Sequence, residues 1–301
     1  VTAYKYFKQS IFEGWCILHV DDIYQAKIDL LNQMKSLENS KIKDSSVLIC
    51  IGAIVLSSYS NARREDCADF LVNLKPPKDP ASTEFITQYI AKNAKKMQTI
   101  NNFVEKIIFR IQTYLESSNK VQLFYAKSLM INLATYATNA IDSCTSMYFD
   151  LLLKAFQSSI EDIMQTASQS LNIYFNLTKQ KQYLPYLDCK ATEFLSSKNQ
   201  MIMKGGLLIL TALIDNFPDN FIDRVQFFMN ATKQILNRDK SISFYCFKIY
   251  IMFIQIKPEY APIANQIVNQ IWPSNELTKL SLDTIDLLKI ILRKYPVCLK
   301  D

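Results

Sequence analysis

The sequence has few of the residues that most enzyme folds need for tight turns and for catalysis. Its 301 residues include four glycines and a single histidine, His19. A β-rich or nucleotide-binding fold of this length would need more glycines for its turns and phosphate loops. A histidine-based triad would have to be built on His19 alone. The composition therefore favours an all-helical fold and gives little support to catalysis.

The seven cysteines are scattered singly, with no C-x-x-C spacing and an odd total. Most lie in apolar runs, where a thiol packs as a small hydrophobic group. Cys16 and His19 are one helical turn apart, but two ligands do not make a zinc site. We expect no metal and no cofactor, and we expect a reducing compartment, either cytoplasm or nucleus.

Long hydrophobic runs are also missing. The longest, 47–56 and 207–214, are shorter than the roughly 20 residues that cross a bilayer. Neither run has the flanks of a signal peptide. We expect no membrane insertion. The chain begins at Val1 and ends soon after a helical segment, so we also expect a fragment of a longer protein.

Helical periodicity is strongest in residues 103–137, which predict two amphipathic helices joined by a polar loop at 116–120. Apolar residues at steps of three and four form one face of the second helix. A narrow polar stripe lies on another side and consists of Ser128, Asn132, Thr135 and Asn139. A helix with so little polar surface must be covered on most of its circumference.

The same layout recurs about every 40 residues, which is the period of stacked helical repeats. The predicted helix pairs are 100–137, 143–177, 181–217, 219–257 and 259–295. The polar loops inside these pairs are 116–120, 157–159, 196–200, 237–241 and 273–277.

The proline-rich stretch KPPKDPAS, residues 75–82, is the strongest helix breaker in the chain. We place the main internal boundary there. Residues 1–74 then form an irregular N-terminal helical segment, either atypical repeats or a cap, and residues 83–301 form the repeat array.

Residues 149–175 resemble a HEAT repeat, in which an apolar first helix and a short polar loop precede a second helix with small residues at close contacts. The small positions in this chain are Ala126, Ala167, Gly206 and Cys246. We interpret Gly205 and Gly206 as close-packing residues, because they lack the spacing and lysine of a phosphate loop. The arginine common early in the second helix is absent from most units.

The resemblance to the HEAT and armadillo-like superfamily covers about residues 100–295. It implies an all-α, right-handed α-solenoid of stacked antiparallel helix pairs. Proteins of this kind include nuclear transport receptors, vesicle-coat adaptors and chromosome-organising subunits. The resemblance therefore favours a non-enzymatic scaffold or adaptor that binds other proteins.

Basic residues in the loops inside the repeats indicate where a partner would bind. Stacking of the repeats would align these loops along one edge. The candidate partner-binding edge consists of Lys120, Lys198, Arg238, Lys240 and Trp272. The net charge of +6 and the isoelectric point near 8.8 make this edge compatible with an acidic partner, namely an acidic protein tail, a phosphoinositide headgroup or nucleic acid.

Three alternatives remain open from the sequence. The basic edge would also suit a nucleic-acid-associated module of a chromatin or RNA complex, whose binding would weaken steeply with salt. A nuclear transport receptor or vesicle-coat adaptor trunk is a further alternative. An enzyme built on the array, such as a DNA glycosylase, would need an acidic residue and an aromatic pair that no local pattern supplies.

Overall fold

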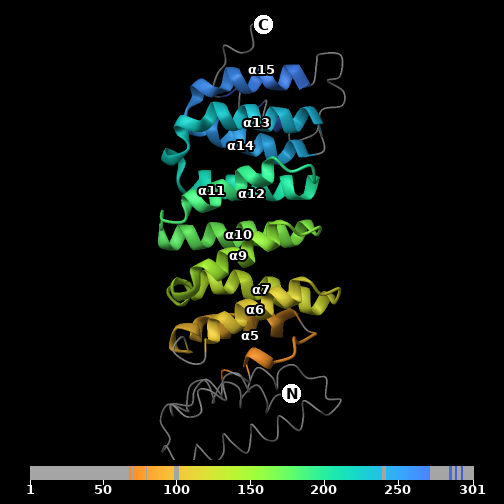
Figure 1. Ribbon diagram of the computed structural model, residues 1–301, viewed down its shortest axis with the longest axis vertical. Helices are drawn as coiled ribbons and strands as arrows, with labels where there is room; N and C mark the ends of the chain where they lie inside the picture. Colours follow the sequence, from red (N-terminus) through yellow and green to blue (C-terminus); the bar gives the residue numbers. More distant parts are fainter. Residues whose placement is uncertain are drawn as a thin grey trace, which may run out of the picture. The chain divides into compact units, whose positions relative to one another are not determined.

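The computed structural model describes residues 68, 71–78, 80–97, 102–238 and 242–271, with isolated positions at 285, 286, 289 and 293. Across these residues the chain is helical and contains no β-strand, which confirms the predicted all-helical class (Figure 1). The predictions for residues 1–67 lie outside the described residues, as do those for Lys240, Trp272 and the loop at 273–277.

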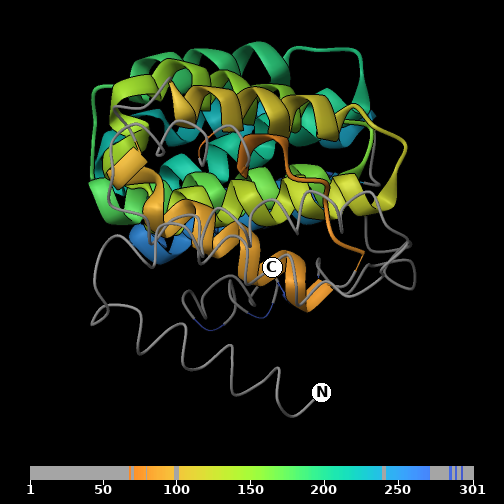
Figure 2. The ribbon, with the colours of Figure 1, turned by 90° about the horizontal axis from the view of Figure 1, so that it is seen from below.

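The chain forms two compact units that divide between Leu151 and Leu152, within helix α9. The first unit contains α5 (Pro80–Met97), α6 (Phe103–Leu115), α7 (Lys120–Tyr136), α8 (Thr138–Ile141), the 3-10 helix η1 (Asp142–Cys144) and the start of α9 (Thr145–Phe156). Helix α7 packs against both α5 and α6. In Figure 2, α5 (orange) runs obliquely beside α7 (yellow).

The second unit continues with helix pairs of similar length. Its elements are α10 (Glu161–Thr178), α11 (Leu184–Leu195), α12 (Gln200–Asn216), η2 (Pro218–Asn220), η3 (Ile222–Arg224), α13 (Val225–Arg238), α14 (Ser243–Ile256), η5 (Pro258–Tyr260) and α15 (Ala261–Ile271). Helix α12 packs against α10, α11 and α14, while α13 packs against α14 and α15.

Helix α5 begins earlier than predicted, at Pro80, so the proline-rich loop does not extend to residue 82. The other two prolines of this stretch, Pro76 and Pro77, lie in irregular backbone. Proline is tolerated in the first turn of a helix, because the N–H that it lacks has no partner in that turn. Pro80 therefore begins helix α5 and does not interrupt it.

Part of the predicted polar stripe is buried where α7 meets α5, whereas Thr135 is half-buried and Asn139 is exposed in α8. Ser128 and Asn132 are buried. The side-chain amide of Asn132 donates to Thr87 Oγ1 of α5 at 3.0 Å. Hydrogen bonding between the two helices thus satisfies a polar group that would otherwise be costly to bury.

Close helix packing explains the two glycines of α12. A Cβ added at Gly205 would fall on the carbonyl oxygen of Phe156. A Cβ added at Gly206 would lie 2.9 Å from the Cβ of Phe194 and 3.0 Å from the carbonyl oxygen of Ala191 in α11. The interpretation of these glycines as packing residues is confirmed. The other predicted small positions, Ala126, Ala167 and Cys246, are fully buried.

The loops inside three helix pairs share one turn geometry. Residues 116–119, 157–160 and 196–199 each have a turn followed by a bend, and the next helix begins directly after them. In each loop the second residue is a serine whose Oγ accepts a hydrogen bond from the backbone N–H two residues later, at 3.1 Å. These serines are Ser117, Ser158 and Ser197.

Candidate functional site

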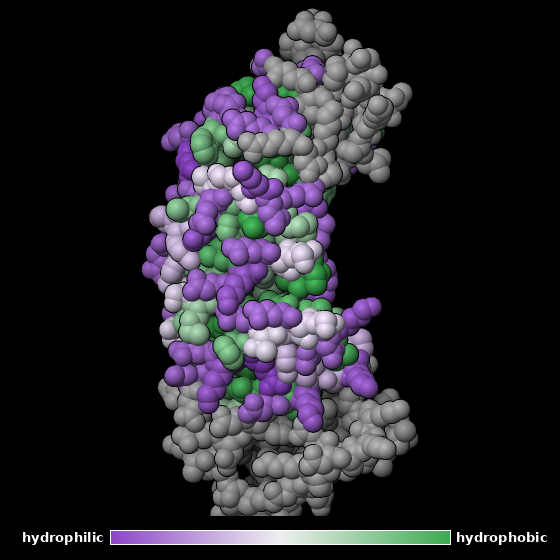
Figure 3. All heavy atoms as spheres, turned by 45° about the vertical axis from the view of Figure 1, so that its right-hand side comes forward, coloured by the Kyte–Doolittle hydropathy of each residue, from purple (hydrophilic) through white to green (hydrophobic). Residues whose placement is uncertain are grey.

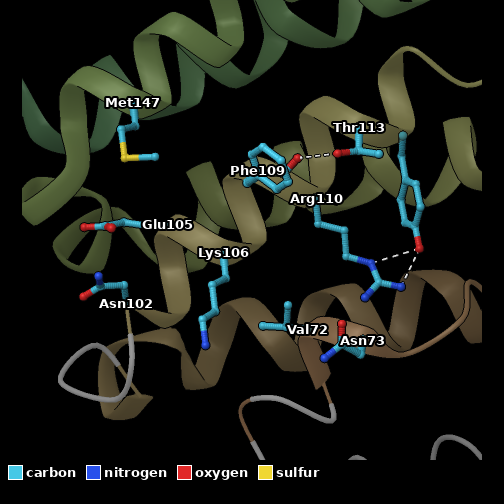
Figure 4. Close-up of a pocket in the computed structure, with 10 residues that line it drawn as sticks. Val72, Asn73, Asn102, Glu105, Lys106, Phe109, Arg110, Thr113 and Met147 are labelled. Atoms are coloured by element: carbon cyan, nitrogen blue, oxygen red, sulfur yellow. Dashed lines mark hydrogen bonds between the residues drawn. The ribbon is translucent and has the colours of Figure 1, made fainter.

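A groove of about 620 Å³ lies along the outer face of α6 in the first unit (Figure 4). Helix α6 turns its isoleucines, Ile107, Ile108 and Ile111, into the core. The opposite face is therefore left to line the groove. We call this surface the α6 groove and define it by Val72, Asn73, Asn102, Glu105, Lys106, Phe109, Arg110, Thr113, Tyr114 and Met147.

The middle of the α6 groove is apolar and open to solvent. Phe109 is 67% exposed, and Met147 at the start of α9 is 37% exposed. Both side chains border the groove, but they come from different helices (Figure 4). Exposed hydrophobic residues are not confined to this groove, since Figure 3 shows hydrophobic residues interspersed with hydrophilic ones over one face of the described chain. Phe109 is the most exposed of the large hydrophobic side chains among the described residues.

Arg110 is held rigidly at one wall of the groove. Its Nη2 donates to the carbonyl oxygen of Leu74 at 2.5 Å, and its Nε donates to the hydroxyl of Tyr114 at 2.9 Å. The guanidinium lies 5.0 Å from the centre of the Tyr114 ring. No carboxylate among the described residues pairs with Arg110, so its positive charge is not neutralised by an ion pair within that part of the chain.

Two further charges, Glu105 and Lys106, lie on the same face of α6, toward its N-terminus. Burial, and after it the Glu105 carboxylate, raises the pKa of the nearby Cys144 thiol to about 11. A thiol with this pKa is protonated at neutral pH and is a poor nucleophile. The groove combines an exposed apolar centre with the charged side chains Glu105, Lys106 and Arg110.

A second cluster of polar side chains joins three helices of the second unit. The Tyr245 hydroxyl of α14 donates to Glu161 of α10, and Lys204 of α12 lies 3.5 Å from the same carboxylate. Gln165 donates to the Tyr245 oxygen at 3.0 Å. The hydrogen bond from Tyr245 holds the pKa of Glu161 below its usual value, while burial raises the pKa of Tyr245 to about 12.

This cluster has a structural explanation. Glu161 and Asp162 lie in the first turn of α10, where carboxylates complement the helix dipole. The additional bonds of Glu161 to α12 and α14 were not predicted. They depend on side chains more than 40 residues away, for which the sequence carries no local signal.

Among the described residues, no group of three or more His, Cys, Asp or Glu side chains is placed to hold a metal ion. None of the described helices is both long and apolar enough to cross a membrane.

The candidate edge predicted from the sequence is only partly described. Lys120 is the first residue of α7 and is exposed, and Lys198 is exposed in the loop before α12. Arg238 ends α13, but its side chain lies outside the described residues, as do Lys240 and Trp272. Lys120 belongs to the first unit and Lys198 to the second, so alignment of these residues along one edge stays a prediction.

The sequence analysis did not predict the α6 groove. The signal that would have indicated it is Phe109, an aromatic residue between Lys106 and Thr113 on the polar side of an amphipathic helix. An apolar residue on that side is exposed unless another element covers it. The contributions of Val72 and Met147 depend on packing between segments distant in the sequence.

Comparisons with known proteins identify no family for this chain. No protein family model matches it, and no curated protein matches it. One similar solved structure is the crystal structure of an engineered protein from the Northeast Structural Genomics Consortium. It is 15% identical, with a TM-score of 0.39, and the match covers 77% of this chain and 97% of the engineered one. A likeness this weak adds nothing to the assignment of fold or function.

Proposed function

We propose that this chain is a HEAT-like α-solenoid that binds other proteins and has no enzymatic activity. The repeated turn supports the repeat architecture. Ser117, Ser158 and Ser197 occupy equivalent positions in turns about 40 residues apart, as expected of consecutive HEAT units. Small buried residues at the helix contacts, such as Gly206, agree with this arrangement.

The observation that carries the binding function is the α6 groove with Phe109 exposed at its centre. An exposed large aromatic ring beside an apolar groove is typical of a surface that contacts another macromolecule. Burying such a ring against a partner would contribute roughly 1.5–3 kcal/mol. The charged side chains at both ends of the groove would supply orientation and specificity.

The partners we propose are proteins with acidic segments, located in the cytoplasm or nucleus. The net charge of +6 favours association with an acidic surface. The exposed Lys120 and Lys198 begin a predicted basic loop edge that Arg238, Lys240 and Trp272 would extend. The chain would then present two binding surfaces, the α6 groove and this edge.

Affinity purification from the source cells tests the proposal. The chain would be used with and without nuclease, beside a variant in which Lys120, Lys198, Arg238 and Lys240 are changed to glutamate. We expect stoichiometric protein partners that survive nuclease and are reduced by the charge reversal. A matched control changes four lysines away from these loops, namely Lys154, Lys181, Lys233 and Lys248.

The outcome distinguishes protein binding from the nucleic-acid-associated alternative. Recovery that depends entirely on nucleic acid would contradict the proposal and favour the nucleic-acid-associated module. Recovery of no protein above the level of an unrelated helical protein would contradict protein binding altogether. Equal loss in the control variant would show that net charge, and not the loop edge, governs recovery.

A further inference from the structure

We infer that the α6 groove is a docking site for a short protein segment that carries an acidic side chain close to a large apolar one. This inference rests on the proposed protein-binding function and specifies the chemistry of the partner. It is carried by Arg110, by Phe109 and by a second arginine in the chain whose carboxylate partner is already present.

Arg110 is an ordered cation without a carboxylate. Two of its nitrogens are fixed by Leu74 and Tyr114, so the side chain would lose little conformational freedom on binding. Its Nη1 makes no hydrogen bond to any described residue. A guanidinium held in this way is suited to donate charge-assisted hydrogen bonds to a carboxylate.

Arg224 in the second unit has both an aromatic ring and a carboxylate partner within the chain. Its guanidinium lies 4.7 Å from the ring centre of Phe228 and 5.6 Å from that of Phe227, and it pairs with the carboxylate of Asp188. Arg110 has the same stacking on an aromatic ring, but no described carboxylate completes it. We infer that a bound segment supplies the missing group.

Phe109 sets the second requirement for the ligand. Its ring is 67% exposed, and Met147 lines the groove with it. A leucine, isoleucine, phenylalanine or tryptophan of the partner would bury apolar surface on both side chains. Phe109 and Arg110 are adjacent on α6, so the apolar and acidic groups of the ligand must be close together as well.

Glu105 makes its end of the groove less favourable for an acidic side chain than the Arg110 end. It precedes Arg110 by five residues, which is about 7.5 Å along a helix. An acidic side chain is attracted to Arg110 and repelled by Glu105, and Lys106 beside Glu105 offsets part of that repulsion. Nucleic acid, whose regularly spaced phosphates need several aligned cations, would meet two cations in this groove, Lys106 and Arg110, with the Glu105 carboxylate beside them. A protein segment therefore fits the groove better.

Selection from a phage-displayed library of random dodecapeptides, with the whole chain as target, tests the inference. We expect enriched peptides to carry Asp or Glu within about four residues of a large apolar side chain. One selected peptide is then synthesised with a fluorescent label, and its Kd is measured by anisotropy. Phe109→Ala should raise the Kd at least tenfold. Phe227→Ala, which removes an exposed ring beside the neutralised Arg224, should leave the Kd within twofold.

A double-mutant cycle separates recognition by Arg110 from its structural role. Replacing the peptide's acidic residue by its amide should weaken binding to the wild type about tenfold. The same replacement should have little effect on an Arg110→Gln variant, whose fold is checked by its thermal transition. If both forms of the chain responded equally to the peptide change, Arg110 would not be the carboxylate's partner.

Several results would overturn the inference. They are the enrichment of no peptide, enrichment of peptides without acidic residues, and binding that Phe109→Ala leaves unchanged. A labelled single-stranded RNA that binds and is lost with Phe109→Ala would assign the groove to nucleic acid instead. Any of these results would leave the scaffold function intact if the affinity purification still recovered nuclease-resistant partners.

Discussion

At the scale of single residues, two buried tyrosines show how hydrogen bonding changes the contribution of the same side chain. Both are fully buried in the core. Tyr125 Oη has no hydrogen-bond partner among the described residues. Tyr250 Oη lies 2.8 Å from Thr232 Oγ1 and 3.3 Å from the carbonyl oxygen of Met229. Burial raises the pKa of both hydroxyls above the ordinary value.

Removing the two hydroxyls should therefore have opposite effects. Tyr125→Phe should leave the free energy of unfolding unchanged or raise it by up to about 1 kcal/mol, because the desolvated hydroxyl forms no bond. Tyr250→Phe should lower it by about 1 kcal/mol. Urea denaturation of both variants measures the difference. A larger loss for Tyr125→Phe than for Tyr250→Phe would show that Tyr125 has a partner in solution.

At the level of the helices, the three repeated turns differ in whether a side chain caps the helix that follows. Asn119 before α7 accepts a hydrogen bond from Val121 N at 2.9 Å, and Asn199 before α12 accepts one from Met201 N at the same distance. Ile160 occupies the equivalent position before α10 and makes no side-chain cap. The backbone of all three residues is extended, with ψ between 111° and 120°.

An asparagine at position 160, in the turn before α10, should therefore cap that helix. Ile160→Asn should raise the free energy of unfolding by about 0.5–1 kcal/mol, whereas Asn119→Ala should lower it by about 1 kcal/mol. Urea denaturation would measure both changes, with Gln169→Ala on the exposed side of α10 as a control. A loss of stability in Ile160→Asn would mean that the exposed isoleucine makes contacts that matter more than the cap.

The contact of α10 with α14 through Glu161 and Tyr245 should depend on pH. The pKa of Glu161 is lowered in the folded chain, so its contribution is present above the unfolded value of 4.5 and is lost as the pH falls through the folded value. The stability difference between wild type and Tyr245→Phe should shrink between pH 7 and pH 3.

The size of this effect should be modest, below about 1 kcal/mol, because the Glu161 side chain is 51% exposed. Urea denaturation at the two pH values measures it. A difference that stays constant would assign the effect of Tyr245→Phe to its bond with Gln165, which carries no charge.

At the scale of the whole molecule, the proposed solenoid makes a prediction about dimensions. A compact globular chain of 301 residues has a radius of gyration of about 19 Å. Stacked repeats extend in one direction and contact only their neighbours, so the radius should be clearly larger. Small-angle X-ray scattering of the monomeric chain measures it. A value at or below 19 Å would contradict the stacked arrangement.

Much of the helical framework could be predicted because its signals are local. Periodicity in 103–137 indicated α6 and α7, and the polar loops at 116–120 and 196–200 marked the turns between helices. The small residues Gly205 and Gly206 indicated close packing, since only a missing Cβ permits such an approach. The candidate binding residues were harder to predict, because loop lysines are common at any surface.

The positions of most of the long helices could be predicted from local patterns, because helical periodicity and capping are set by residues within one or two turns. Tertiary packing alone brings Asn132 of α7 to Thr87 of α5, Arg110 to Leu74, and Glu161 to Tyr245. These contacts join residues 36 to 84 positions apart. They depend on how the helices pack in each unit, so no local pattern encodes them.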